Sequence, residues 1–345
     1  MKCKIIGGEF TVDLQNHHEA KEKNVTHDGI YKYSTGRSAL YYILLDLKNT
    51  RGIHKILLPD YLCSSVVIAA EKAKVDVVFY PLNEILELDE SFFAKLYDET
   101  YAVLLINYYG LKDISNQVDY IRSLNAEAVI IEDDVQAFYE FEKELNGVDY
   151  KFTSLRKTFA CPDGGLVKTN NTMPIINDEN KFHQFKLAGS LLKTFQKPEF
   201  YDDDVFLSMF EKGEDLIDED IAKGMSKVSG NIISKTDTVQ IAEIRRRNAK
   251  FICDGLQSLG IHTIIPVPEE KVPLFVPVFL EDRNKVRKFL FEHNCFCPVH
   301  WPLESLNIAK GVEMAEHELS IIVDQRYTAA DMEYILNLIA KSKLW

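Results

Sequence analysis

An acidic residue and a lysine in the middle of the chain have the spacing and surroundings that suit cofactor chemistry. Lys157 stands 24 positions after Asp133, which follows the apolar run Ala128–Ile131, and the glycine pair Gly164–Gly165 comes soon after the lysine. A carboxylate can hold a protonated ring nitrogen, and a lysine can hold an aldehyde as a Schiff base. Pyridoxal 5′-phosphate (PLP) needs both attachments from a protein, so these residues predict a PLP site.

A phosphate-binding turn is predicted ahead of this pair. Ser34–Leu40 has the composition of a helix start, in which Ser34 or Thr35 can cap the helix and Gly36 allows close approach of the backbone. Free amides and the helix dipole at such a start bind phosphate. Most Ser-Thr-Gly helix starts are only caps, so this interpretation stays open beside the functional one. Ser154 is a second candidate phosphate ligand, and Gln136 could orient the Asp133 carboxylate or bind the ring hydroxyl.

The elements that must position these residues alternate between strand and helix. Apolar strand patterns at 54–58, 75–80, 102–106 and 128–131 are separated by helical spacing at 63–74 and 117–124. Strands that are apolar on both faces indicate an α/β fold with a mainly parallel central sheet covered by helices. Ligands bind such sheets at the carboxyl ends of the strands, and Tyr61, Asn107 and Asp133 follow predicted strands there.

The second half of the chain has a different pattern. Residues 172–235 are polar and helical in places, a long helix is expected over 236–259, and strands at 272–279 and 319–323 alternate with helices at 283–293 and from 329 onward. We therefore expect an N-terminal segment over 1–30, a large cofactor-binding domain over 31–235 and a smaller C-terminal α+β domain over 236–345. His300 and Trp301 would contact substrate in the cleft between the domains, although a structural role for this aromatic pair is an equal alternative.

Composition excludes several classes of protein. The net charge of −13 argues against a nucleic-acid surface. No apolar run approaches the roughly 20 residues of a membrane span, and the first residues lack the apolar core of a signal peptide. The six cysteines contain no C-x-x-C pair, so neither a disulfide framework nor a metal site is expected, and a reducing cytoplasm fits best.

Taken together, the chain resembles the DegT/DnrJ family of sugar aminotransferases, which are PLP enzymes of fold type I. The resemblance runs in order through most of the chain, over the segments Ser34–Leu40, Pro59–Ser65, Asn107–Gly110, Glu132–Phe138, Ser154–Gly165, Cys297–Pro302 and Asp324–Tyr327. It implies a homodimer that moves an amino group, with glutamate as donor, to a nucleotide-linked keto-deoxysugar in surface-polysaccharide or secondary-metabolite biosynthesis.

The resemblance also implies roles for individual positions. Asp133 would hold the ring nitrogen beside Gln136, and Lys157 would bind the aldehyde. The phosphate would be held by Gly36, Arg37, Ser38 and Ser154. Cys63 falls where the family places a residue over the ring face, often an aromatic one, so Tyr61 or Tyr108 would stack on the ring instead.

One departure from the family pattern affects the substrate. Family members carry an Asn-x-Arg motif that reaches the partner subunit's site, whereas this chain keeps Asn231 but has Ile233 in place of the arginine. Two alternatives therefore stay open. The first is a PLP enzyme with a non-nucleotide substrate or another PLP reaction, and the second is a non-catalytic binding or regulatory protein with the same fold.

Overall fold

The fold was analysed in a computed structural model, which describes residues 5–12, 29–95, 101–195, 203–301, 303 and 311–342. Most of the predicted N-terminal segment 1–30, and Pro302 of the motif at 297–302, lie outside the described residues. Among the described helices, none combines the length and the apolar character required to cross a membrane.

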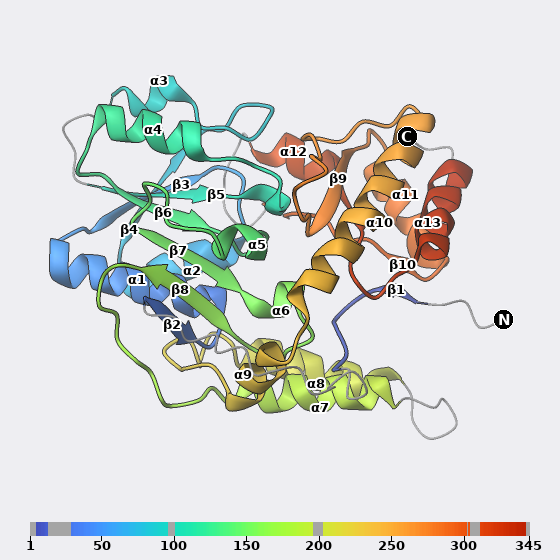
Figure 1. Cartoon of the computed structure of the whole chain (residues 1–345), viewed down its shortest axis with the longest axis horizontal. Helices are drawn as coiled ribbons and strands as arrows, with labels where there is room; N and C mark the ends of the chain where they lie inside the picture. The colour runs from blue at the N-terminus through green and yellow to red at the C-terminus, as the bar shows by residue number, and fades with distance from the viewer. Residues whose placement is uncertain are drawn as a thin grey trace.

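A seven-stranded sheet forms the centre of the larger part of the molecule (Figure 1). Its strands, in spatial order, are β2 (Ile30–Tyr33), β8 (Gly165–Thr169), β7 (Tyr150–Ser154), β6 (Val129–Asp133), β5 (Ala102–Ile106), β3 (Lys55–Pro59) and β4 (Asp76–Tyr80). Among these described strands, β8 runs in the direction opposite to the other six. The predicted α/β class with a mainly parallel sheet is confirmed.

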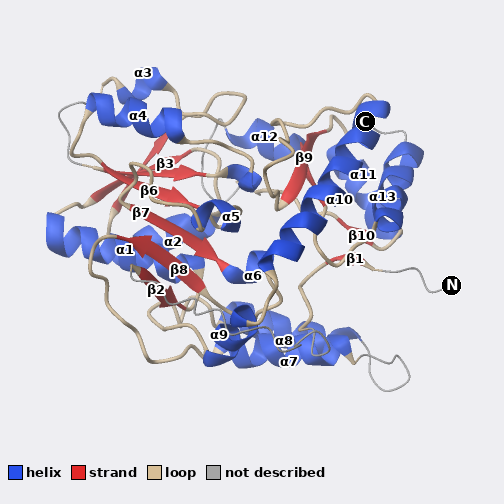
Figure 2. Ribbon diagram, in the orientation of Figure 1, coloured by secondary structure: helices blue, strands red, loops and turns tan. Residues whose placement is uncertain are grey.

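Side chains alternate between the two faces of this sheet, and helices cover both faces (Figure 2). On one face Ile56 and Leu58 pack in a cluster with α1 (Gly36–Arg51) and α2 (Ser64–Ala73), whereas Leu57 faces a second cluster with α4 (Ser115–Leu124). Burial on both faces explains why β5 is wholly apolar and why β3 and β6 each carry a run of three apolar residues.

Short helices follow several strands: α3 (Glu90–Phe93), the 3₁₀ turn η1 (Tyr108–Gly110), α5 (Phe138–Phe141) and α6 (Leu155–Thr158). Beyond β8 the chain forms α7 (Phe182–Thr194) and α8 (Asp203–Asp215), which pack against each other, and then α9 (Lys227–Ser234). The sequence analysis did not anticipate β2, β7 or β8. The pattern of β7 is misleading because its Lys151 and Thr153 are polar and yet buried.

The C-terminal residues build a second apolar cluster. Here the antiparallel strands β9 (Phe275–Phe279) and β11 (Glu318–Ile322) pack against helices α10 (Thr238–Ser258), α11 (Arg283–Glu292) and α13 (Ala329–Ser342). Helix α12 (Gly311–His317) leads into β11, and β10 (Cys295–Phe296) pairs with β1 (Ile6–Gly7). Ile6 belongs to the same cluster as residues of α13. The division of the chain at residue 236 stays a prediction.

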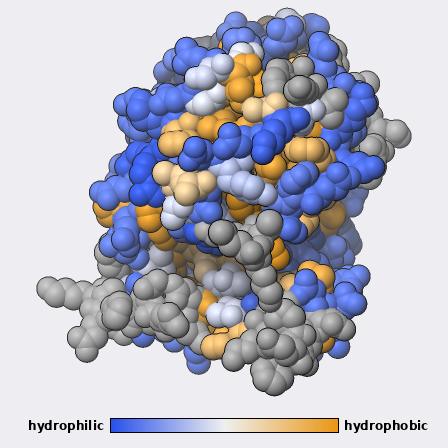
Figure 3. Space-filling view, turned by 90° about the vertical axis from the view of Figure 1, so that its right-hand side faces the viewer, coloured by the Kyte–Doolittle hydropathy of each residue, from blue (hydrophilic) through white to orange (hydrophobic). Residues whose placement is uncertain are grey.

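Hydrophilic side chains dominate the side of the molecule that carries this second cluster, with apolar ones showing between them (Figure 3). The exposed large apolar side chains on these C-terminal elements include Phe279 and Phe296.

Candidate active site

The main cavity lies where the parallel strands end and the second cluster begins. It has a volume of about 370 Å³, within the range typical of small-molecule sites. Strand ends supply Ile106 from β5, Asp133 from β6 and Ser154 from β7, and the C-terminal part of the chain supplies Phe275 and His300. The site therefore lies at the sheet edge that the alternating pattern predicts.

Asp133 is a buried carboxyl group at the end of β6. Its neighbours in the sheet are Ile106 of β5 and Phe152 of β7, and its Oδ1 accepts a hydrogen bond of 2.9 Å from the Val135 amide. Burial raises the pKa of Asp133 to about 7, because the single amide bond only partly offsets the loss of water. Such a carboxyl group is well placed to receive a cationic N–H donor.

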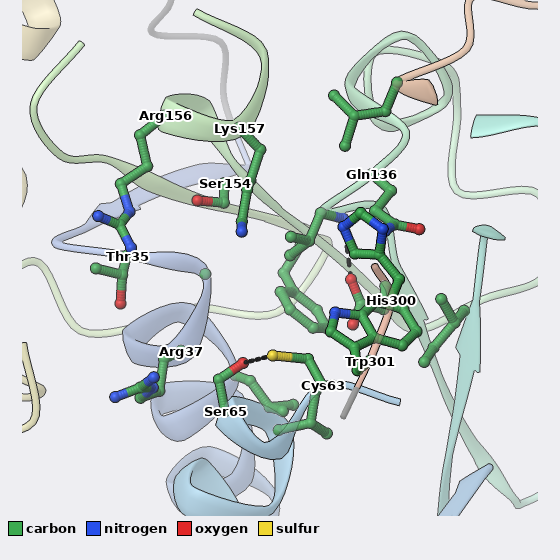
Figure 4. A pocket seen from close by; sticks show the side chains of 18 of the residues that line it. Thr35, Arg37, Cys63, Ser65, Gln136, Ser154, Arg156, Lys157, His300 and Trp301 are labelled. Atoms are coloured by element: carbon green, nitrogen blue, oxygen red, sulfur yellow. Dashed lines mark hydrogen bonds between the residues drawn. The ribbon is translucent and has the colours of Figure 1, made fainter. Parts of the chain in front are cut away.

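Lys157 lies on the short helix α6, directly after β7. The start of this helix is fixed by a hydrogen bond from the Leu155 amide to the Gly164 carbonyl, 2.9 Å long. The Lys157 side chain is exposed and extends into the cavity (Figure 4). Its amino group has no hydrogen bond or ion pair with any residue that the structure describes, so it is available to a ligand.

The first turn of α1 forms another wall of the cavity. Thr35 caps the helix by accepting a hydrogen bond of 3.1 Å from the Ser38 amide, and the first turn contains no acidic residue. A Cβ on Gly36 would come within 3.0 Å of Val135 and 3.3 Å of Ser154, so glycine leaves the turn open to the cavity. A Cβ on Gly165 would lie 1.9 Å from the Thr35 carbonyl oxygen. Glycine at 165 therefore lets β8 approach this helix start.

Two arginines flank the same helix start, and both are held by acidic residues from the region of α8. Arg37 pairs with Asp218, and Arg156 pairs with Glu214 at 2.8 Å. Lys186 also contacts Glu214, at 2.5 Å. Burial alone would raise the pKa of Glu214, but the Arg156 and Lys186 charges lower it to about 2. Carboxylates within the protein thus pair with both guanidinium groups, whereas Lys157 has no such partner among the described residues.

The structure brings most of the predicted site residues to this cavity, and their roles stay predictions. The predicted residues that line it are Gly36, Arg37, Cys63, Asp133, Gln136, Ser154, Lys157, His300 and Trp301. The Gln136 side-chain oxygen accepts a hydrogen bond of 2.9 Å from the Tyr109 amide, which leaves its NH₂ group for the cavity. The Ser65 hydroxyl bonds to the Cys63 sulfur at 3.1 Å.

Four predicted residues are not among those that line the cavity. Ser38 is buried, and its hydroxyl is bonded within the helix start to Ser34 and Thr35. Tyr61 and Tyr108 lie behind Trp301, with ring centroids 5.3 and 6.3 Å from it.

These two tyrosines therefore pack against Trp301, and a stacking role for either stays a prediction. Their hydroxyl groups are used in the interior: Tyr61 donates to the His300 carbonyl and Tyr108 to the Tyr61 carbonyl at 2.5 Å. Asn231 is exposed on α9 and does not line the cavity of its own chain. Its role in a partner's site stays a prediction.

Sequence reasoning missed several lining residues because no local motif marks them. Thr35 is predicted only as a cap, and no role is predicted for Arg156. Glu214, Ile217, Leu274, Phe275 and Pro298 reach the cavity through tertiary packing of distant segments. The acidic run at 214–220 was a visible signal, but only its ion pairs with Arg37 and Arg156 show its place beside the site.

Comparison with known proteins relates the fold to solved structures. No family model and no curated protein matches the sequence. Spr1654 of Streptococcus pneumoniae, a proposed sugar aminotransferase solved in its PLP form, is similar with a TM-score of 0.68 and 14% identity over 97% of this chain and 93% of that one.

Two further structures extend the likeness. A DegT DnrJ EryC1 StrS aminotransferase from Brucella abortus aligns with a TM-score of 0.62 and 15% identity over 90% of this chain and 85% of that one. A NifS-like protein aligns with a TM-score of 0.59 and 16% identity over 91% of this chain and 82% of that one. The chain therefore has the fold of these proteins, fold type I of the PLP-dependent enzymes, and the predicted fold class is confirmed.

Proposed function

We propose that this protein is a PLP-dependent aminotransferase of the DegT/DnrJ type. One observation carries the proposal: Asp133, Lys157 and the open first turn of α1 surround one cavity. The similar structures support it, because one is a PLP form of a proposed sugar aminotransferase and another is named for this family.

The residues of the cavity fit the cofactor. Asp133 is a buried carboxyl group with a pKa raised to about 7 by burial, and a protonated ring nitrogen would restore the charge partner that it lacks. The amides of the α1 start, with Ser154 opposite Gly36, would hold the phosphate. Cys63 and Trp301 would contact the ring, since both line the cavity beside Asp133.

Each residue of this chain then has a defined task. Lys157 would attach the aldehyde through Nζ and, once displaced by the amino substrate, would accept and return a proton at Nζ. When bound, PLP supplies an electron sink for the carbon that carries the amino group. Asp133 would keep the ring nitrogen protonated, and Gln136 would fix the neighbouring backbone through its bond to the Tyr109 amide.

The finer parts of the proposal concern substrate and setting. We infer glutamate as amino donor and a nucleotide-linked keto-deoxysugar as acceptor, used in surface-polysaccharide or secondary-metabolite biosynthesis. We also infer a homodimer in the cytoplasm. Support comes from the sugar aminotransferases among the similar structures and from the motif resemblance.

The first experiment tests attachment of the cofactor. Purified protein is mixed with PLP, its visible absorption is recorded, and borohydride reduction is followed by peptide mass spectrometry. We expect a visible band and a reduced adduct on Lys157. The matched controls are Lys157→Arg, which should carry no adduct, and Lys227→Arg on the exposed face of α9, which should behave as wild type. A colourless protein without an adduct on Lys157 would refute the proposal.

A second candidate, a PLP enzyme with different chemistry, is favoured by two observations. A NifS-like protein is among the similar structures, and Ile233 replaces the arginine of the family motif. Adding glutamate to the PLP-loaded enzyme separates the candidates. Loss of the visible band, followed by its return with one member of a panel of keto sugar nucleotides, indicates amino transfer. Isotopically labelled glutamate then identifies the product. A band that glutamate leaves unchanged favours the second candidate.

A further inference from the structure

His300 is held at the cavity by a chain of hydrogen bonds from β11. Its Nδ1 lies 2.7 Å from the Ser320 hydroxyl oxygen, and that hydroxyl donates to Glu318 Oε1 at 2.5 Å. The backbone amide of His300 donates to the other carboxylate oxygen, Glu318 Oε2, at 2.6 Å. Glu318 and Ser320 are fully buried, so water does not compete for these bonds.

The carboxylate of Glu318 determines which atom donates and which accepts in each of these hydrogen bonds. In its ionised form Glu318 has no hydrogen to donate, and both of its oxygens accept. Ser320 has one hydroxyl hydrogen and gives it to Glu318, so its oxygen can only accept from His300. The imidazole must then carry its proton on Nδ1, and in the neutral ring the lone pair is on Nε2.

Aromatic rings hold the imidazole on its other sides. The ring centroids of Phe275, Trp301 and Tyr109 lie 5.1, 5.3 and 5.9 Å from that of His300. The His300 carbonyl accepts a hydrogen bond from Tyr61. The ring lines the cavity (Figure 4), and Nε2 has no hydrogen-bond partner among the residues that the structure describes.

The other ionisable groups near the ring are two tyrosines, Arg283 and Asp133. Burial raises the pKa of Tyr61 and Tyr109 well above 10, so both phenols stay protonated. Arg283 of α11 donates to the carbonyl oxygens of Glu318 and Ala315. Asp133 lines the same cavity. Glu318 is thus the acidic group joined to the imidazole through hydrogen bonds.

We propose that Glu318 and Ser320 are positioning residues that hold His300 in its Nδ1–H tautomer, so that Nε2 accepts a hydrogen bond from a hydroxyl group of the keto substrate. This substrate assignment rests on the proposed function, whereas the tautomer does not. A polar site built to bind a hydroxyl group discriminates strongly against analogues without it. His300 thereby becomes a specificity-determining residue for hydroxylated, sugar-like acceptors.

The tautomer is tested on the purified protein without substrate. Long-range ¹⁵N–¹H NMR spectra of protein with ¹⁵N-labelled histidine are recorded at about pH 8, well above the ordinary histidine pKa of about 6.5. His300→Gln identifies the His300 signals among the nine histidines. We expect wild type to show the Nδ1–H form and Ser320→Ala to show the Nε2–H form.

Two further variants make this test specific. In Glu318→Gln, an amide NH₂ group at the Oε1 position would donate to Ser320, whose hydroxyl would then donate to Nδ1 and move the imidazole proton to Nε2. Ser342→Ala removes another buried serine hydroxyl, one that bonds within α13, and should leave the tautomer unchanged. An Nε2–H form in wild type, or the same tautomer in wild type and a folded Ser320→Ala, would overturn the proposal.

The substrate part is tested by separating the two half-reactions of the PLP-loaded enzyme. Ser320→Ala should lower kcat/KM for the keto sugar nucleotide found in the panel by about tenfold, the typical effect of one hydrogen bond. The glutamate half-reaction should change less than about twofold. Equal losses in both half-reactions would refute the hydroxyl contact. If no acceptor reacts at all, the proposed function fails, and the NMR result still decides the tautomer.

Discussion

Strand β6 carries neighbouring carboxyl groups, Glu132 and Asp133, in very different surroundings. Glu132 pairs with Lys151 of β7 at 3.1 Å, and both side chains are buried. Asp133 faces the cavity with one backbone hydrogen bond and no cation beside it among the described residues. Residues of almost identical chemistry thus differ by partner: one charge is neutralised inside the fold, and the other is left for a ligand.

This difference separates structural from functional charge. Removing one partner of a buried ion pair destabilises the fold, because the other charge is then buried without compensation. An unpaired buried carboxyl group lowers the stability of the free protein, and binding of a cation beside it raises that stability again. We therefore expect a substitution at 132 to lower mainly the stability of the fold, and a substitution at 133 to lower mainly turnover.

The largest effect is expected from removing the charge at the cavity. Asp133→Asn should lower turnover of the PLP-loaded enzyme by about a thousandfold, because losing the partner of a buried charge costs about 3–5 kcal/mol. The steady-state rate and the urea midpoint are measured together. A loss of turnover that merely follows a loss of folding would instead indicate a structural role for Asp133.

The pH dependence of stability sharpens the comparison. The pKa of Asp133 is raised by burial to about 7, and that of an unfolded aspartate is about 3.9. The native state then binds more protons over this range, so its stability falls as pH rises from about 4 to 7, by at most about 4 kcal/mol.

Urea unfolding of the cofactor-free protein at several pH values checks this. The difference in stability between Asp133→Asn and wild type should grow in favour of the variant as pH rises through that window. Parallel curves for the two proteins would show that Asp133 does not titrate there.

At Glu132 we expect the main effect on stability rather than on cofactor binding. Glu132→Gln should lower the free energy of unfolding by up to about 3 kcal/mol, because it removes the carboxylate 3.1 Å from the buried Lys151 and leaves Asp134 as the acidic group that interacts with this lysine. The PLP absorption band should persist in the folded variant. As a matched control, Glu132→Leu combined with Lys151→Met removes both charges and should be nearly neutral. If the double variant were as unstable as Glu132→Gln, packing rather than charge would explain the loss.

The smallest effect is expected at the rim, where Glu214 is paired but about half exposed, with 47% of its side-chain surface accessible. Burial alone would raise its pKa, but the positive charges of Arg156 and Lys186 stabilise the carboxylate and lower the pKa to about 2. A carboxylate whose pKa is lowered by folding stabilises the native state at pH values above its unfolded pKa of about 4.3. This contribution is lost as the pH falls toward 2. Glu214→Gln should therefore cost less than about 1 kcal/mol at pH 7 and nothing near pH 2. Thermal unfolding at both pH values measures it, and an equal cost at both would contradict the ionic origin.

The sequence by itself determined the four apolar parallel strands β3, β4, β5 and β6 and the edge at which the cavity lies. Apolar runs such as Ala102–Ile106 are buried on both faces, and this pattern can be read without any tertiary information. The order of Asp133, Lys157 and Gly164–Gly165 likewise indicated which strand ends would carry chemistry. Local sequence was enough to predict the cap at Thr35, because this residue bonds to Ser38, its near neighbour at the start of α1.

Tertiary structure alone decided which side chains share the cavity and which protons they carry. Tyr61 and Tyr108 are near the predicted site in sequence, yet packing behind Trp301 uses their rings and hydroxyl groups in the interior. The chain from Glu318 to His300 joins residues 18 positions apart through hydrogen-bond directions. Burial and partners are properties of three-dimensional packing, and they decide that Glu132 is paired inside the fold while Asp133, one residue further on, faces the cavity.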